Sequence, residues 1–299
     1  MAKPKRPRGQ AARADRHELY ELSVQDPPSE VEFITRSFRK LRRRKPLSLR
    51  EDFCGTAVFC LAWVQSDRAR TAIGVDLDRD TLAWGLDKRI RPADQAANQA
   101  KQLESRITLR NANVLEPCGP LVDVAVGFNF SYWCFSTRES LRAYFEAARA
   151  GLAPGGILYL DAYGGTEVPI PDVNEREVHD EGGSVNGGEP FTYIWEQRNY
   201  NPMTGHMDCA IHFTFEDGSR LDQAFTYSWR VWNLPELREL LLEAGFTKVR
   251  FWAEREDSRG EGTGEYIEAD ELDNEGVWWV YISAENGPGE NRRSRSKTR

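Results

Sequence analysis

Two short segments constrain the fold of this chain more than any other feature. The first, LREDFCGTAVF at residues 49–59, passes from a strand-like run through a glycine turn into an apolar helical run. The second, AIGVDLD at residues 72–78, is a short β-rich run that ends at Asp76. A glycine turn lets the backbone approach a ligand, and an acid at the end of the next strand accepts hydrogen bonds from both ribose hydroxyls. The pattern predicts a Rossmann-like nucleoside site.

Strand and helix patterns alternate from residue 47 onward. Ser136 and Glu139 are predicted to form the capping box of the last helix in this part of the chain. Such alternation indicates an α/β fold, with a mostly parallel sheet covered by helices on both faces. The predicted strands are residues 47–51, 72–76, 107–111, 122–128 and 157–161, and the predicted helices are residues 57–64, 81–86, 96–103 and 138–152.

The alternation breaks after the fifth strand. Residues 164–190 are rich in glycine, proline and charge and are predicted to be a loop. An antiparallel β insert follows, then a helix, then two strands joined by an acidic loop, so the last strand is expected to be antiparallel in the main sheet. The insert strands are residues 191–200, 206–215 and 221–231, the helix is residues 233–244, and the final strands are residues 249–253 and 277–284, joined by the loop at 254–275.

Charge separates the ends of the chain from its body. The net charge is −7, yet residues 1–16 carry six Lys or Arg and one Asp, and residues 285–299 carry five Lys or Arg and two Glu. We predict disordered basic tails at residues 1–16 and 286–299. The domain between them, residues 17–285, includes a helical extension at 17–45 and the β insert at 190–232.

Composition limits the classes of protein to which the chain belongs. No apolar run is long enough to span a bilayer, so no membrane partner is expected. Five cysteines without a CxxC pair argue against disulfides or structural zinc, and His206 and His212 lie too far apart on one strand to share a metal. These features predict a soluble, cytoplasmic protein without a metal.

With two further segments, the chain resembles the class I S-adenosylmethionine-dependent methyltransferases. GLAPGGILYLDAYGG at residues 151–165 is similar to that family's PGG turn into the fifth strand. LPELRELLLEAGFTKVRFW at residues 234–252 is similar to the helix–aGF–strand unit before its terminal hairpin. The form LREDFCGTA also resembles an uncharacterised subgroup of bacterial and plant methyltransferases. The resemblance covers residues 47–285 and implies methyl transfer with S-adenosylmethionine as cofactor.

The resemblance also implies a role for particular residues. It places one loop under the methionine moiety, an acid on the ribose, two contacts to adenine, a residue beside the sulfonium and an aromatic lid. In that order, the residues are Glu51, Cys54, Gly55 and Thr56 for the loop, Asp76 for the ribose, Leu77 and the pair Asn113 and Val114 for adenine, Asn129 for the sulfonium, and Tyr20 for the lid. Where the family has DxGxGxG, this chain keeps only the central glycine, Gly55.

The residues that would contact the acceptor are less distinct. The segment GFNFSYWCF at residues 127–135 lacks the [DN]PP[YFW] pattern of nucleic-acid and protein amide N-methyltransferases. Tyr132 and Tyr163 follow strand ends and are the best catalytic candidates, whereas Cys134 is disfavoured as a nucleophile. Glu196 and Arg230 are candidates for binding a charged substrate group, and His17 and His179 are predicted in surface loops. Further aromatic candidates, which either line a pocket or fill the core, are Trp133, Tyr193, Trp195, Tyr227 and Trp229.

Three functions fit these features. The first is methyl transfer to a small molecule, covered by the β insert and the N-terminal helix. The second is an RNA- or ribosome-directed methyltransferase that uses the basic tails and the cationic residues 39–45. The third is a non-catalytic scaffold that binds the cofactor, and a nicotinamide oxidoreductase is a more distant alternative. We favour the small-molecule enzyme because the nucleic-acid methylation patterns are absent.

Overall fold

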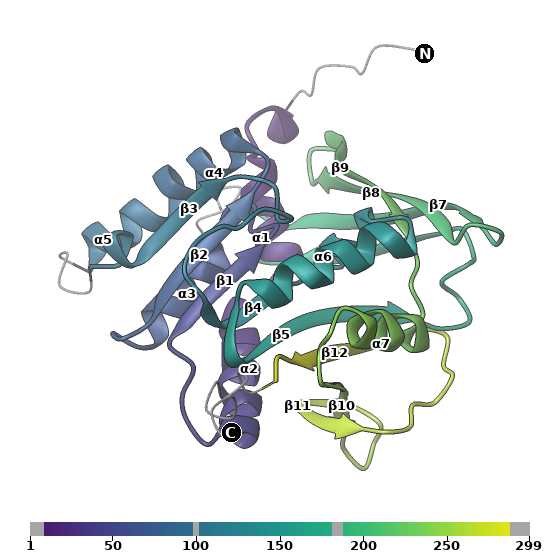
Figure 1. Ribbon diagram of the computed structural model, residues 1–299. Helices are drawn as coiled ribbons and strands as arrows, with labels where there is room; N and C mark the ends of the chain where they lie inside the picture. Colours follow the sequence, from purple (N-terminus) through teal and green to yellow (C-terminus); the bar gives the residue numbers. More distant parts are fainter. Residues whose placement is uncertain (1–8, 98–101, 181–187, 288–299) are drawn as a thin grey trace, which may run out of the picture.

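The computed structural model describes residues 9–97, 102–180 and 188–287. Its main sheet has eight strands in the order β11-β10-β12-β5-β4-β1-β2-β3 (Figure 1). Neighbours among β1 to β5 pair in parallel, whereas β12 is antiparallel to both β5 and β10. The predicted α/β sheet with an antiparallel last strand is therefore confirmed. The strands are β1 (Ser48–Asp52), β2 (Thr71–Asp76), β3 (Ile107–Asn111), β4 (Val122–Gly127), β5 (Leu152–Gly164), β10 (Lys248–Glu256), β11 (Gly262–Ala269) and β12 (Trp278–Glu285).

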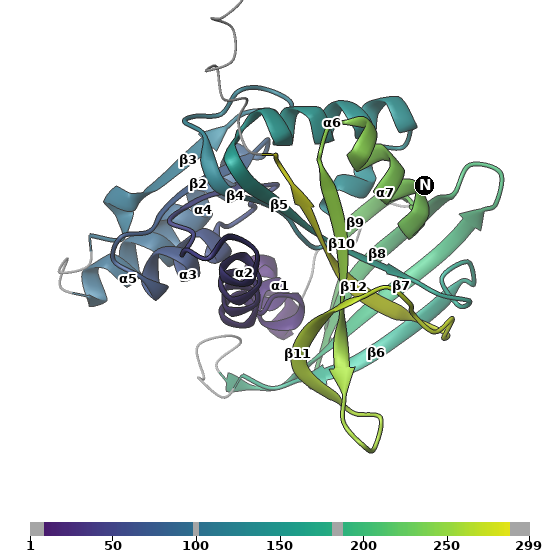
Figure 2. The same ribbon diagram turned by 60° about the horizontal axis from the view of Figure 1, so that its bottom comes forward.

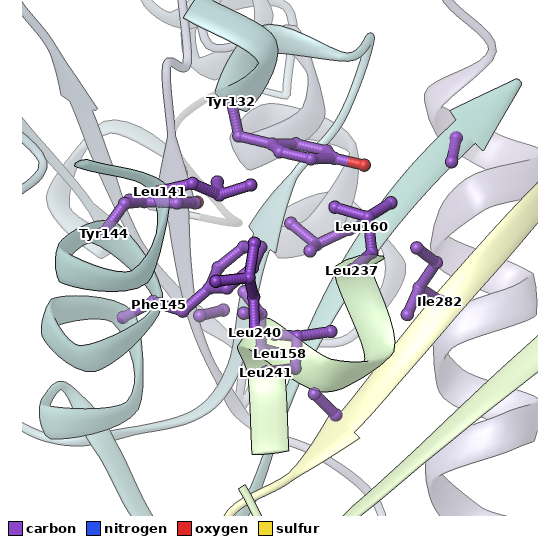
Figure 3. Packing of buried hydrophobic residues seen from close by; sticks show 14 of the residues in the cluster. Tyr132, Leu141, Tyr144, Phe145, Leu158, Leu160, Leu237, Leu240, Leu241 and Ile282 are labelled. Carbon is purple, nitrogen blue, oxygen red and sulfur yellow. The ribbon is translucent and has the colours of Figure 1, made fainter. Parts of the chain in front are cut away.

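Helices cover both faces of this sheet. On one face, α6 (Arg138–Ala150) and α7 (Leu234–Glu243) bury Leu141, Phe145 and Leu241 against strand residues such as Leu158 and Ile282 (Figure 3). The other face carries α2 (Pro27–Arg42), α3 (Val58–Ser66) and α4 (Arg79–Gly85). A π turn, Leu86–Ile90, continues α4 into α5 (Arg91–Ala96).

A second sheet follows β5, with four antiparallel strands in the order β6-β7-β8-β9. Its strands are β6 (Asp172–Val178), β7 (Phe191–Asn201), β8 (His206–Phe215) and β9 (Arg220–Arg230). Both views show it on the side of the molecule away from α3 and α5 (Figures 1 and 2). The predicted β insert is thus present, with one strand more than expected.

The helix α1 (Arg16–Val24) connects the second sheet to the main one. Leu19 is fully buried and belongs to the apolar cluster of the second sheet. On the other side, Glu21 accepts a hydrogen bond from the Thr56 hydroxyl at 2.5 Å and one from Arg89 at 2.6 Å. The N-terminal extension therefore fixes the second sheet over the loop that follows β1.

Three secondary-structure predictions were wrong. β6 lies in the predicted loop at 164–190, and β11 lies in the predicted loop at 254–275. Both are edge strands with mostly exposed side chains, so neither has an apolar pattern that sequence alone would reveal. The helix predicted at 96–103 is misplaced, because α5 ends at Ala96; residues 98–101 lie outside the described residues.

The N-terminal prediction and one cap also need correction. Residues 9–16 are not a disordered tail, because the Gln10 and Ala11 backbone N–H groups donate to Asp217 at 2.8 Å and to Ser219 at 3.0 Å. Composition alone cannot reveal such contacts with a distant turn. Residues 1–8 and 288–299, most of the predicted tails, lie outside the described residues. The capping box of α6 is formed by Thr137 and Ser140, one residue later than predicted.

No helix formed by the described residues combines the length and the apolar character that crossing a bilayer requires.

Candidate functional site

The loop after β1 has a left-handed backbone at three positions, two of which are not glycine. Phe53, Gly55 and Ala57 have φ angles of 58°, 52° and 60°. These are the three positions where the DxGxGxG pattern has glycine. The left-handed backbone is therefore kept even at Phe53 and Ala57, where glycine is absent. The left-handed region costs a residue other than glycine roughly 1–2 kcal/mol. Packing offsets this cost at Phe53, whose ring centroid lies 5.4 Å from that of Tyr144.

The charged residues of the same motif are structural. Arg50 and Asp52 are buried and form two hydrogen bonds, of 2.8 and 2.9 Å, and Tyr144 donates a third to Asp52 at 3.2 Å. Glu51 points to the opposite face and accepts the Cys60 N–H at 3.1 Å. Burial raises the pKa of Glu51 to about 8. Glu51 therefore supports the start of α3 from beneath the loop.

A cavity of about 450 Å³, here called the β1–β2 cavity, lies at the carboxyl ends of these two strands and β4. Asp76 lines it, and its carboxylate accepts the Gly55 N–H and the Asp78 N–H, both at 2.8 Å. A Cβ atom at Gly55 would have no neighbouring atom within 4 Å, so this part of the wall faces open space. Six of the residues predicted to bind the cofactor line this cavity: Tyr20, Cys54, Gly55, Thr56, Asp76 and Asn129.

Four predicted cofactor residues do not line the cavity. Glu51 lies beneath the loop, as described above. Val114 is buried in the core, Asn113 accepts the Leu115 N–H at 3.0 Å, and Leu77 is 71% exposed. The family resemblance implied these positions, and the path of the chain turns their side chains elsewhere.

Other residues that line this cavity, or contact the residues that line it, were missed. His17 lies in α1, not in a surface loop, and lines the cavity; burial lowers its pKa. Gly85 of α4 packs so closely that a Cβ atom there would lie 2.1 Å from the Thr56 carbonyl oxygen. Asn111 donates to the carbonyl groups of Asp76 and Leu77, at 3.2 and 2.8 Å. Only the capping residue Asp78 had a local signal, since an aspartate before a helix is a favoured N-cap. The other missed residues lining the cavity are Arg16, Gln25, Phe53, Thr81, Ser131, Phe225, Thr226 and Ser228.

A second cavity of about 410 Å³, here called the insert cavity, lies between the main sheet and the second sheet. Four residues line both cavities: Tyr20, Asn129, Tyr227 and Trp229. The two cavities therefore adjoin at these residues. Eight aromatic side chains line the insert cavity, namely Tyr20, Phe130, Tyr163, Tyr193, Trp195, Tyr227, Trp229 and Trp279. The four insert aromatics named from the sequence all belong to this wall.

The two tyrosines predicted as catalytic candidates have different positions. Tyr163 lines the insert cavity, and its hydroxyl is buried without a hydrogen-bond partner among the described residues. Burial raises the Tyr163 pKa, so the phenol stays protonated near neutral pH. The prediction that Tyr132 is catalytic needs correction. Tyr132 is fully buried beneath α6 (Figure 3), and its hydroxyl donates to the Asp161 carbonyl at 2.7 Å. Trp133 is likewise fully buried and stacks on Tyr163, with ring centroids 4.9 Å apart.

The candidates for substrate charge and nucleophilic attack also change. Glu196 lies on the other face of the second sheet, where it accepts hydrogen bonds from Arg198 and His212 at 2.8 and 2.9 Å. Arg230 forms an ion pair with Glu236 at 3.0 Å, and neither Arg230 nor Glu196 lines a cavity described above. Cys134 does line the β1–β2 cavity and is partly exposed, but desolvation by the surrounding protein raises the pKa of its thiol to about 11, so the thiol is protonated near neutral pH.

Three carboxyl groups, those of Glu30, Glu51 and Asp161, lie near one another in the described structure. Asp161 accepts the N–H groups of Asn129 and Phe130, at 2.7 and 3.0 Å, and burial raises its pKa to about 7. Burial and the charges of Asp161 and Glu51 raise the pKa of Glu30 well above its ordinary range. None of these three carboxyl groups forms a salt bridge with another described residue. A positive charge bound nearby would favour the ionised forms of these groups and lower their pKa values. No group of side chains that could hold a metal ion occurs in the described ranges.

Comparison with known proteins gives fold relatives only. No protein-family model matches the sequence, and no curated protein matches it. A solved S-adenosylmethionine-dependent methyltransferase from Clostridium acetobutylicum has a TM-score of 0.61 at 14% identity, covering 91% of this chain and 97% of that one. An amino pentose methyltransferase of calicheamicin biosynthesis from Micromonospora echinaspora has a TM-score of 0.60 at 15% identity, covering 90% and 95%. A sugar N-methyltransferase from Streptoalloteichus has a TM-score of 0.59 at 15% identity, covering 95% and 98%.

Proposed function

We propose that this chain, which has the fold of the class I S-adenosylmethionine-dependent methyltransferases, transfers a methyl group from S-adenosylmethionine to a small molecule. One observation carries the proposal: two cavities adjoin at Tyr20, Asn129, Tyr227 and Trp229. A methyl transferase needs a site for the donor and a site for the acceptor, with the reacting atoms facing one another. The structural relatives are methyltransferases, and two act on sugars according to their descriptions.

The residues of the β1–β2 cavity fit the methyl donor. Asp76 would accept hydrogen bonds from the ribose hydroxyls, and the open space beside Gly55 lets the ligand approach the backbone. Asp161, whose pKa is about 7 and which accepts the Asn129 N–H at the junction, is the carboxyl group whose charge would suit a ligand with a sulfonium and an ammonium group. When bound, S-adenosylmethionine supplies a methyl group whose bond to sulfur breaks as the bond to the acceptor forms, with the electron pair kept by sulfur.

The protein's main contribution would be orientation. Asn129 is held with a φ of 57° by its hydrogen bond to Asp161, so the chain after β4 is fixed at the junction. Tyr20 and Tyr227 line both cavities at the same place. Burial raises the pKa of both tyrosines, so neither is a base near neutral pH. Aligning a nucleophile with a methyl group is worth up to about 7–11 kcal/mol in favourable cases.

The surface that would favour an RNA substrate lies elsewhere. Arg39, Lys40 and Arg43 line a groove together with Ser66 and Arg70, at the amino-terminal ends of β1 and β2. The two cavities lie at the carboxyl ends of these strands. A nucleic acid bound along the groove would thus lie at the wrong edge of the sheet for methyl transfer, so we favour the small-molecule acceptor.

The proposal is tested by offering methyl-labelled S-adenosylmethionine and cell extract to the full chain. Label in the small-molecule fraction would support it, whereas label in RNA or protein would favour the alternative enzyme. Absence of transfer to every fraction, although the cofactor binds, would favour a non-catalytic scaffold.

The first test of the donor site is Gly55→Ala. The added methyl group enters the open space of the cavity, so the affinity for S-adenosylmethionine should fall about ten-fold or more, measured by calorimetry. The backbone strain at φ 52° should lower the free energy of unfolding by only about 1 kcal/mol. Gly218→Ala is the matched control: its φ is 74° and its Cβ also meets nothing within 4 Å, but it lies in the β8–β9 turn. Equal cofactor affinities of the two variants would remove Gly55 from the donor site.

A second test concerns pH. The pKa of Glu51 is raised from 4.5 to about 8, so between these values the folded protein keeps a proton that the unfolded chain has released. The contribution of Glu51 to the free energy of unfolding of the cofactor-free protein should therefore be fully present near or below pH 4.5. This contribution should be lost as the pH rises to 8. Glu51→Gln keeps an acceptor for the Cys60 N–H and should stabilise the protein at pH 8 by roughly 1–3 kcal/mol. Urea unfolding at several pH values measures this, with exposed Glu139→Gln as control; an unchanged pH slope in Glu51→Gln would contradict it.

A further inference from the structure

We infer that the acceptor is an organic cation with an apolar body, whose positive charge is held far from the atom that receives the methyl group. This inference rests on the proposed function, because it assigns the insert cavity to the acceptor. Its basis is the charge, shape and register of that cavity.

Charge along the cavity wall has one sign. Among the described residues, the lining contains two carboxylates, Glu167 and Asp172, and no Lys, Arg or His. The remaining wall is mainly aromatic, and aromatic faces attract cations. Arg176 lies outside this lining, 5.5 Å from the centroid of the Tyr193 ring, and donates to the Ser23 carbonyl. An acceptor with a carboxylate or phosphate would therefore meet no cationic side chain among the described lining residues, which disfavours anions.

Strand register separates the carboxylates from the point of transfer. Asp172 pairs with Gln197, Gln197 with Cys209, and Cys209 with Tyr227, so these residues form one row across four strands. Directly paired residues share a face of the sheet. Three spacings between strands separate the backbones of Asp172 and Tyr227 by roughly 14 Å. Tyr227 borders the β1–β2 cavity, whereas Asp172 lies at the far edge.

The far end is built as part of the fold. The Gln197 amide donates to the carbonyl groups of Val168 and Ile170, at 2.5 and 2.6 Å, and so holds the loop that carries Glu167. The Glu167 N–H donates to Gly276 at 2.9 Å. Tyr163 also lines the cavity, and its hydroxyl is buried without a hydrogen-bond partner among the described residues.

The test uses three probes with the same body: 4-phenylbutylamine, 4-phenylbutan-1-ol and 4-phenylbutyrate. Their binding to the full chain is measured by calorimetry, with and without S-adenosylhomocysteine. We expect the amine to bind about ten-fold more tightly than the alcohol, and the acid to bind most weakly. The combined variant Glu167→Gln, Asp172→Asn should bind amine and alcohol alike. Glu175→Gln, on the other face of β6, should keep the preference of the parent.

The outcomes separate this inference from the proposed function. Equal affinities for the three probes, tighter binding of the acid, or no binding of the amine would overturn the inference, even if S-adenosylhomocysteine binds normally. Failure of S-adenosylhomocysteine to bind would instead overturn the proposed function. An amine preference that persists in the combined variant would also overturn the assignment of the charge to Glu167 and Asp172.

Discussion

Replacing Asp76 with alanine should weaken S-adenosylmethionine binding by about 100-fold or more. The carboxylate would accept hydrogen bonds from two ribose hydroxyls, and a hydrogen bond to a charged group is worth about 1.5–3 kcal/mol. Losing two such bonds removes about 3 kcal/mol or more, which corresponds to at least about 100-fold in affinity. The variant also frees the N–H groups of Gly55 and Asp78, which Asp76 holds at 2.8 Å. Calorimetric titration measures the loss.

Two matched variants make this prediction specific. Asp76→Asn keeps an acceptor of the same shape but removes the charge, so its loss should lie between those of the parent and the alanine variant. Asp80→Asn removes an exposed carboxylate in the first turn of α4, outside the cavity lining, and should bind as the parent does. Cofactor affinity of Asp76→Ala within two-fold of the parent would exclude Asp76 from the donor site.

The second large effect is expected beneath the loop, at the buried ion pair. Asp52→Ala leaves the Arg50 guanidinium without its two hydrogen bonds, although Arg50 is only 3% exposed. Removing one partner of a buried pair typically costs about 3–5 kcal/mol, because the remaining charge stays desolvated. Urea denaturation should show a loss of stability of this size.

A double variant distinguishes the stranded charge from a loss of packing. Replacing both partners by apolar residues of similar volume, Arg50→Met with Asp52→Leu, should recover most of the stability lost in Asp52→Ala. The exposed pair of Asp87 and Arg91 provides the surface control, since Asp87→Ala should cost below about 1 kcal/mol. Equal losses for Asp52→Ala and Asp87→Ala would contradict the structural role assigned to the pair.

The sequence predicts the fold well where burial leaves a pattern. β2 and β4 are largely apolar and lie inside the sheet, and the capped helix α7 has a clear apolar face, so their types were correct. β6 was missed because six of its seven residues are exposed, and an edge strand of polar residues has no apolar pattern to detect. Its omission hid the far end of the insert cavity.

For the candidate site, the sequence predicts positions at turns better than side-chain directions. Gly55 and Asp76 lie in the cavity because a turn and a strand end fix their places. Leu77 and Val114 lie beyond strand ends, where tertiary packing decides the side-chain direction. Leu77 is exposed and Val114 is buried, and neither lines the cavity. The lining of the insert cavity runs in sequence from Tyr20 to Trp279, and no local sequence pattern predicts that residues so far apart in the chain line one cavity.

The central claim is that the donor and the acceptor meet where the two cavities adjoin. A crystal structure of the full chain with S-adenosylhomocysteine tests it most directly. The ribose hydroxyls should lie within hydrogen-bond distance of the Asp76 carboxylate, and the sulfur should face the insert cavity between Asn129 and Tyr20. Binding of S-adenosylhomocysteine with its sulfur turned away from Tyr227 and Trp229, or at another surface of the protein, would contradict the account.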